Sequence, residues 1–176
     1  MRLFVALAIP DSVAATMFLI QAGVPGAKWQ TREQLHLTLR FIGEVDGRDG
    51  SMIDDALAAI SGPPFTLALK GVGEFGGKTP RALWAGVSDP AAVTHLARKI
   101  ETAMQRIGLP AEERKFTPHV TLARLRGAPA VKVIDYLADH ALYASAPCKV
   151  HEFRLYSSML TPDGSVYVPE RVYPLT

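Results

Sequence analysis

Two histidines of this sequence stand in the same four-residue pattern, His-x-Thr-Leu. One copy spans His36–Leu39 and the other spans His119–Leu122. The composition predicts far fewer than one such pattern by chance, so two copies are a specific signal. They are separated by close to half of the 176-residue chain, which is the separation that a duplicated half-domain would produce.

The residue types of the repeated pattern suit acid–base chemistry at a phosphate. Residues i and i+2 of a strand point to one face, so His36 shares a face with Thr38, and His119 shares a face with Thr121. If a pseudo-twofold axis relates the halves, the two pairs face each other across one groove. One imidazole can then act as general base and the other as general acid, while the hydroxyls donate hydrogen bonds to phosphate oxygens. The sequence alone does not assign the two roles.

Other interpretations of the histidines carry less weight. A lone strand histidine more often satisfies a structural hydrogen bond, but two in the same motif favour a function. A catalytic zinc site needs a third ligand, and neither motif contains a carboxylate or a second histidine. We therefore predict no metal. The remaining histidines, His95, His140 and His151, have no partner motif and are expected to be structural or exposed.

The composition limits the class of protein. Hydrophobic residues make up 48% and charged residues 20%, which excludes a disordered chain. The net charge of +2 is too small to indicate a nucleic-acid binder, so any anion site must be local. The single cysteine, Cys148, excludes an internal disulfide and favours a cytoplasmic setting. No apolar stretch suits a membrane span, and the start, Met1–Ile9, is interpreted as a buried strand rather than a signal peptide.

Apolar spacing, glycines and prolines predict a mixed order of elements. Strands are expected at residues 2–9, 35–42, 65–69, 82–87, 118–125, 148–157 and 166–173. Helices are expected at residues 11–22, 49–60, 90–107 and 130–140. A glycine-rich loop is expected between residues 69 and 82, and Trp29 and Trp84 are expected to lie in the core.

Several blocks of the sequence resemble the two-histidine phosphoesterase superfamily. The resemblance is to its bacterial and archaeal RNA 2′,3′-cyclic phosphodiesterase branch, also called 2′-5′ RNA ligase. It covers nearly the whole chain, through Arg2–Ala6, Trp29, Leu35–Val45, Pro80–Gly86, Phe116–Arg124, Ser158–Tyr167 and Tyr173–Leu175.

The resemblance implies a fold and an activity. The fold would be a single α+β domain of residues 1–176, made of two pseudo-symmetric lobes, with antiparallel sheets facing a central cleft and helices on the outside. The activity would be metal-independent hydrolysis of RNA 2′,3′-cyclic phosphate ends to 2′-phosphomonoesters, with reversible 2′-5′ RNA ligation as a secondary reaction. The substrate would be an RNA or oligonucleotide with such an end, and a monomer without cofactor, membrane or obligatory protein partner would suffice.

The resemblance also implies roles for individual residues. His36 would donate a proton to the departing 3′ oxygen, and His119 would accept a proton from the attacking water. Thr38 and Thr121 would bind phosphate oxygens. Phe41 and Arg124, each five residues after a histidine, would contact the substrate.

Strand geometry conflicts with this last implication. Strict alternation puts position i+5 on the face opposite the histidine, so Phe41 and Arg124 need a bulge, a strong twist or the end of a strand to reach the site. By the same parity, Arg40 is expected on the histidine face.

Two further functions fit the same residues. One is a related phosphoesterase for another cyclic phosphate, such as a cyclic ADP-ribose phosphate or a small cyclic nucleotide. The other is a non-catalytic RNA-binding module, in which the histidines only contact phosphate.

Overall fold

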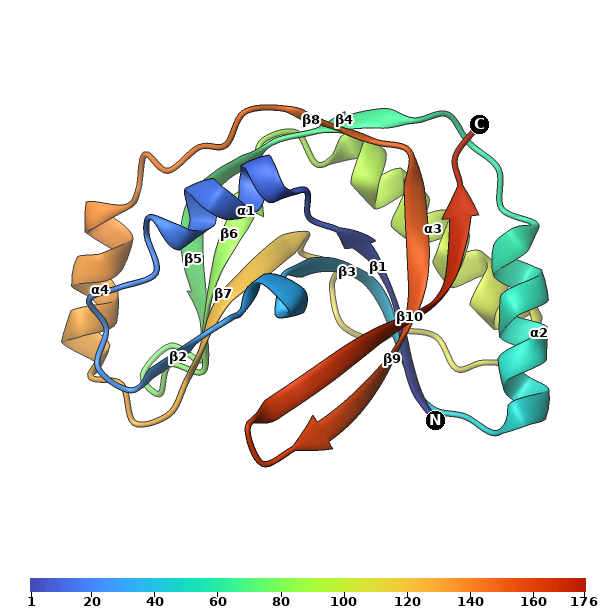
Figure 1. The fold of residues 1–176 in the computed structure, drawn as a ribbon, viewed down its shortest axis with the longest axis horizontal. Helices are drawn as coiled ribbons and strands as arrows, with labels where there is room; N and C mark the ends of the chain where they lie inside the picture. Colours follow the sequence, from blue (N-terminus) through green and yellow to red (C-terminus); the bar gives the residue numbers. More distant parts are fainter.

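Strands and helices alternate irregularly along the chain, in an order close to the predicted one. The computed structural model describes residues 1–176. The strands are β1 (Arg2–Ala8), β2 (Ala27–Trp29), β3 (His36–Glu44), β4 (Phe65–Leu67), β5 (Leu69–Phe75), β6 (Ala82–Val87), β7 (His119–Leu125), β8 (Cys148–Val150), β9 (Glu152–Thr161) and β10 (Gly164–Pro174) (Figure 1). The helices are α1 (Asp11–Phe18), the short 3₁₀ helix η1 (Arg32–Gln34), α2 (Gly47–Ala58), α3 (Ala91–Arg106) and α4 (Ala130–Asp139).

One large antiparallel sheet organises the molecule. Its strand order is β10-β9-β1-β3-β7-β6-β5, with β2 paired to β7, while β4 and β8 form a separate pair. The two motif strands, β3 and β7, lie at its centre and are joined by a single residue pair, Leu37 with Val120. Each motif strand is followed outward by two further strands, β1 and β9 beyond β3, and β6 and β5 beyond β7. The predicted α+β class with antiparallel sheets is confirmed, while two lobes around a central cleft remain a prediction.

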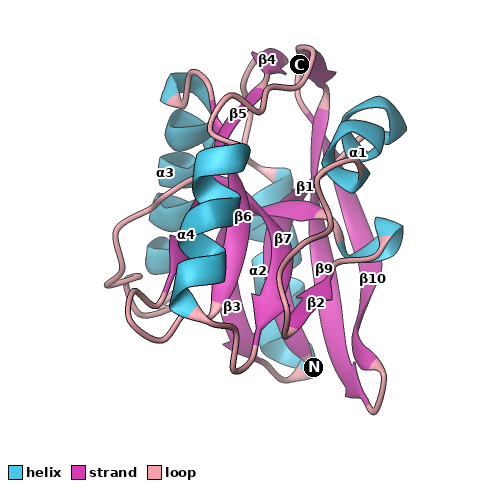
Figure 2. Cartoon of the chain, turned by 90° about the vertical axis from the view of Figure 1, so that its left-hand side faces the viewer, coloured by secondary structure: helices cyan, strands magenta, loops and turns pink.

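The hydrophobic core fixes which face of the central strands is free. Helix α3 buries the apolar stripe Val93, Leu96, Ala97, Ile100 and Met104 and packs on β3. It lies on the side of the strands away from α1 (Figure 2). The motif residues Leu37, Leu39, Val120 and Leu122 are all buried in the same core. Alternation therefore leaves the histidines and threonines on the opposite face, as predicted.

Both motif strands contain a β-bulge at the same place. On β3 the register moves from Val5 with Arg40 to Ala6 with Thr38, so Leu39 is the extra residue. On β7 it moves from Leu83 with Ala123 to Trp84 with Thr121, so Leu122 is the extra residue. Each bulge falls three residues after the histidine and reverses the alternation beyond it. The predicted conflict of parity is resolved by these two bulges.

The predicted glycine-rich loop is shorter than expected, since residues 69–75 form strand β5 and only residues 76–81 connect it to β6. This strand pairs with β6, and a Cβ added at Gly73 would overlap the Trp84 side chain. Glycine usually weakens a strand, but here its bare backbone lets the indole lie close. The predictions also missed β2 and η1, and they extended α1 beyond Phe18.

Candidate active site

His36 begins strand β3 and is held by its own chain. Its Nδ1 lies 2.7 Å from the carbonyl oxygen of Gln34, so Nδ1 donates the hydrogen and Nε2 remains free. The ring packs against Phe4 at 4.9 Å between centroids and meets Tyr167 edge-on at 5.0 Å. Strand β10 is kept in place here because the Gln34 side chain donates to the carbonyl of Ser165 at 3.0 Å. Gln34 thus holds both the histidine and the strand that covers it.

His119 begins strand β7 with the same local geometry. Its Nδ1 lies 2.5 Å from the carbonyl oxygen of Thr117, two residues earlier, so Nε2 is again the free nitrogen. Its neighbours are Phe75, edge-on at 5.0 Å, and Trp84 at 5.8 Å. Both halves therefore present an imidazole in the same orientation relative to its strand.

Burial and charge make both imidazoles weakly basic. Burial lowers the pKa of His36 to about 4, against the hydrogen bond to Gln34, and the charges of Arg124 and His119 lower it further. Burial also lowers the pKa of His119, and the charge of Arg124 adds to that effect. The guanidinium of Arg124 thus acts on both histidines. At pH 7 both rings are neutral in the free protein.

The predicted substrate-binding residues lie on the histidine face. Thr38 and Thr121 are part-buried there, and neither hydroxyl makes a hydrogen bond within the protein. Beyond its bulge, Phe41 packs against the cluster of Phe4, Ala6 and Tyr156. Arg124 is exposed beyond the equivalent bulge and is near enough to lower the pKa of both histidines. The structure thus places the six predicted site residues on one face.

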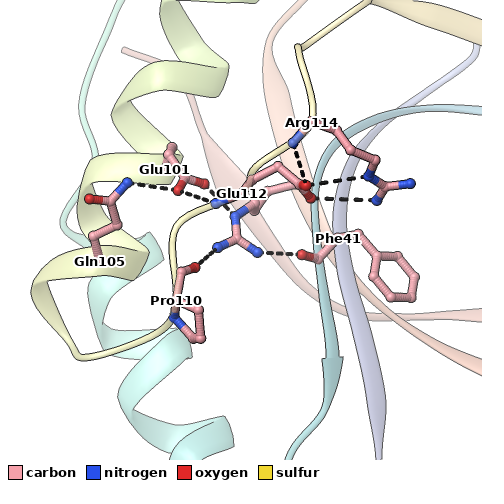
Figure 3. A network of polar contacts seen from close by, with 7 residues as sticks. Phe41, Glu101, Gln105, Pro110, Glu112 and Arg114 are labelled. Carbon is pink, nitrogen blue, oxygen red and sulfur yellow. Dashed lines mark hydrogen bonds and ion pairs between the residues drawn. The ribbon is translucent and has the colours of Figure 1, made fainter.

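The expectation for Arg40 was wrong, because the bulge at Leu39 turns its side chain to the core side. There it is 8% exposed, donates to a Glu101 carboxylate oxygen on α3 and donates to the carbonyl of Pro110 at 2.6 Å (Figure 3). Burial would raise the pKa of Glu101, but bonds from Gln105, the Glu112 backbone and Arg40 hold it below its usual range. Arg40 therefore connects β3 to the segment that leads into β7.

The sequence analysis did not predict several aromatic residues of the site. They are Phe4, Tyr156 and Tyr167 around His36, and Phe75 and Trp84 around His119. Trp84 was predicted to be a core residue, yet it lies on the histidine face. Strand alternation could have predicted this position. The neighbours of Trp84 in the strand, Leu83 and Ala85, point into the core, so Trp84 must point to the opposite face. Trp29 does pack against the core, as predicted.

The other three histidines lie apart from the matched pair. His95 and His151 are exposed, and His140 packs against Tyr136 at 4.5 Å between centroids. No group of three or more histidine, cysteine or carboxylate side chains is arranged to hold a metal ion. None of the helices has the length and apolar character to cross a membrane.

Fold and site together define an α+β protein with two matched histidines at the starts of adjacent central strands. A family model for the 2′-5′ RNA ligase superfamily matches residues 9–159, and the chain belongs to this superfamily.

Curated relatives named RNA 2′,3′-cyclic phosphodiesterase align over nearly the whole chain. The protein of Archaeoglobus fulgidus is 32% identical, over 98% of this chain and 99% of its own. The protein of Aeropyrum pernix is 37% identical, over 89% and 87%, and that of Escherichia coli K12 is 32% identical, over 99% and 97%. The predicted family and the predicted class, an enzyme that hydrolyses phosphodiester bonds, are confirmed.

Solved structures agree with this membership. TT0787 of Thermus thermophilus has a TM-score of 0.84 and 28% identity, over 99% of this chain and 98% of that one. Escherichia coli LigT complexed with 3′-AMP has a TM-score of 0.82 and 27% identity, with the same coverage.

Proposed function

We propose that this protein hydrolyses RNA 2′,3′-cyclic phosphate ends to 2′-phosphomonoesters, with His36 as proton donor and His119 as proton acceptor. The reaction needs neither metal nor cofactor. The observation that carries the proposal is the matched pair of imidazoles, each with Nδ1 bonded to a carbonyl two residues earlier and Nε2 free. The names of the curated relatives support the choice of substrate.

The proposed step is an in-line displacement at phosphorus. Nε2 of His119 takes a proton from water as the water oxygen bonds to phosphorus. Nε2 of His36 gives a proton to the 3′ oxygen as the bond between phosphorus and that oxygen breaks. Each proton transfer is worth about 10²–10⁴-fold in rate.

The low pKa of His36 has a consequence for its role as donor. With a pKa of about 4, its ring is neutral at pH 7, whereas a general acid must carry a proton. A cyclic phosphate diester carries one negative charge, and a nearby negative charge raises the pKa of a histidine. The substrate itself therefore supplies the condition under which His36 holds its proton.

The remaining predicted residues bind the phosphate and its nucleoside. The free hydroxyls of Thr38 and Thr121 donate to the non-bridging oxygens, and Arg124 offsets the charge that develops on them. Phe41 supplies an apolar contact for the nucleoside. Escherichia coli LigT, complexed with 3′-AMP and with phosphate, is a relative that holds ligands of this kind.

The proposal includes the organisation of the chain. Residues 1–176 form one domain of two related lobes that arose by duplication, and a monomer acts on RNA without a protein partner. The matched strand order and the two equivalent bulges support the duplication. When a 5′-hydroxyl replaces water at His119, the same step forms a 2′-5′ diester; opening of the strained ring in water makes hydrolysis the main reaction.

The test uses an RNA oligonucleotide with a 2′,3′-cyclic phosphate end and a chelator. Wild-type protein, His36→Ala and His119→Ala are compared, and ³¹P NMR locates the product phosphate. We expect a 2′-phosphate from the wild type with chelator present, and a loss of at least about 10²-fold in each variant. Turnover retained in either variant contradicts the assignment, and a 3′-phosphate means that acid and base lie on the opposite sides of the ring.

A further inference from the structure

A cavity opens beside His36, and none of the other residues assigned above lines it. Its volume is about 730 Å³, and it is bounded by the end of β1, the start of α1, η1, and strands β8, β9 and β10. Its lining includes Leu35, which precedes His36, and Ala8, the cross-strand neighbour of His36 on β1. The cavity therefore begins one residue from the proposed proton donor.

Two tyrosines are shared between His36 and this cavity. Tyr167 meets the imidazole edge-on at 5.0 Å, and Tyr156 lies at 6.4 Å between ring centroids. Both also line the cavity. A molecule that passes from His36 into the cavity would follow the surface of these rings.

The cavity wall offers hydrogen-bond donors that the protein does not use. Arg32 donates to Asp11 through Nε and to the carbonyl of Ile9 through Nη2, and Arg154 donates to Glu152 through Nε and Nη2. Nη1 of Arg32 therefore has no partner within the protein, whereas the Arg154 guanidinium also interacts with the Tyr156 hydroxyl. Lys149 is exposed on β8 and makes no ion pair. Of the carboxylates that line the cavity, Asp11 and Glu152 are already paired with Arg32 and Arg154. Lys149 and Nη1 of Arg32 can therefore hold an anion without breaking an existing bond.

We propose that this cavity binds the RNA strand 5′ to the terminal cyclic phosphate, with the first internal phosphodiester at Lys149 and beside the Arg154 guanidinium. The inference rests on the proposed function, in which the 3′ oxygen leaves toward His36. The ribose carries that oxygen, so the nucleoside and the chain beyond it lie on the His36 side, while water occupies the His119 side. The cavity volume falls within the range of about 300–1,000 Å³ that is typical of ligand sites.

The consequence is a preference for longer substrates. A 2′,3′-cyclic mononucleotide with a free 5′-hydroxyl has no internal phosphodiester and leaves the cavity unused. A dinucleotide with the same end fills it. We expect the wild type to show a kcat/KM about tenfold higher for the dinucleotide, since one charge-assisted bond in a partly enclosed site is worth about that much.

The decisive measurement compares two substrates. It is the ratio of kcat/KM for the adenosine dinucleotide that ends in a 2′,3′-cyclic phosphate to kcat/KM for adenosine 2′,3′-cyclic phosphate. It is determined for wild type, Lys149→Glu and the matched control Lys132→Glu, which reverses an exposed charge on α4 outside the cavity. We expect Lys149→Glu to lower the ratio about tenfold, since it places like charges together, and Lys132→Glu to leave it unchanged. Both side chains are exposed, and circular dichroism confirms that the variants fold.

The other outcomes are distinguishable. Failure of the wild type to turn over either substrate overturns the proposed function. Turnover of both substrates with equal kcat/KM, or with a ratio that Lys149→Glu does not change, overturns the cavity alone. A ratio lost in Arg114→Ala but kept in Lys149→Glu overturns it also, because the chain would then leave past Arg114 at the other end of β3.

Discussion

The two halves of the site contain the same tetrapeptide but surround it differently. His36 is enclosed by Phe4 and by Tyr167, which β10 carries across it, and burial lowers its pKa to about 4. His119 has Phe75 and Trp84 beside it, and its pKa is lowered as well, again mainly by burial. A repeated motif therefore places two equivalent groups, while the neighbouring strands decide how readily each one holds a proton.

The equivalent positions beyond the two bulges carry different residue types. Phe41 of the first half corresponds to Arg124 of the second, so one half supplies an apolar contact and the other a charge. On the core side, Arg40 corresponds to Ala123, so only the first half has an ion pair with a buried guanidinium. Under the proposed function, the two halves of the site would therefore make different contacts with one asymmetric substrate.

The largest expected effect comes from the buried ion pair of the first half. Arg40→Ala removes the charged partner of Glu101 and the donor to Pro110, while the bonds to Glu101 from Gln105 and the Glu112 backbone remain. We expect a loss of about 3 kcal/mol in the free energy of unfolding by urea. The control Arg171→Ala breaks an exposed pair with Asp54 and is expected to cost less than about 1 kcal/mol. Equal losses would mean that Arg40 does not connect the halves.

The next effect concerns the pH dependence of stability. Folding lowers the pKa of His36 from 6.5 to about 4. Between pH 6.5 and pH 4 the His36 ring is therefore protonated in the unfolded chain but mostly neutral in the folded protein. Stability is therefore lost as the pH falls from 7 to 4, by up to about 3 kcal/mol from this group. His36→Gln should flatten that part of the curve more than His119→Gln does. Identical curves for the two variants would contradict the difference between the halves.

A charge shared by both halves gives a kinetic prediction. Arg124→Ala is expected to lower kcat/KM about 10²-fold by removing a group that offsets developing charge. Because Arg124 lowers the pKa of both histidines, its loss raises them, and the low-pH limb of the kcat/KM profile should move to higher pH. Arg126→Ala, an exposed neighbour, serves as the control and should leave the profile in place.

The smallest effect tests the packing of the second half. Gly73→Ala places a Cβ against Trp84, and we expect a loss of about 1–3 kcal/mol in stability. The NMR signals of the His119 ring should shift more than those of His36, since only His119 contacts Trp84. Gly47→Ala, where an added Cβ meets no neighbouring side chain, is the control and should neither lower stability nor shift the histidine signals. Equal shifts at both histidines would contradict the separation of the two environments.

Much of the fold follows from local patterns in the sequence. The repeat identified both histidines and both threonines, and the apolar residues between them predicted which face would be buried. Strand β6 was predicted with its observed bounds, because its apolar residues stand between clear breaks. Strand β5 was not, because its glycines, Gly71 and Gly73, have low strand propensity and only the pairing with β6 makes this segment a strand.

The sequence by itself determined that two His-x-Thr pairs lie on strands with their leucines in the core, because side-chain alternation is a local property of an extended chain. Only the tertiary structure decided that Phe41 and Arg124 lie on the histidine face and that Arg40 does not. These outcomes depend on the bulges at Leu39 and Leu122, which arise from the register between β3 and β1 and between β7 and β6. A register is set by strands that are distant in sequence and meet only when the sheet forms, so no local pattern contains it.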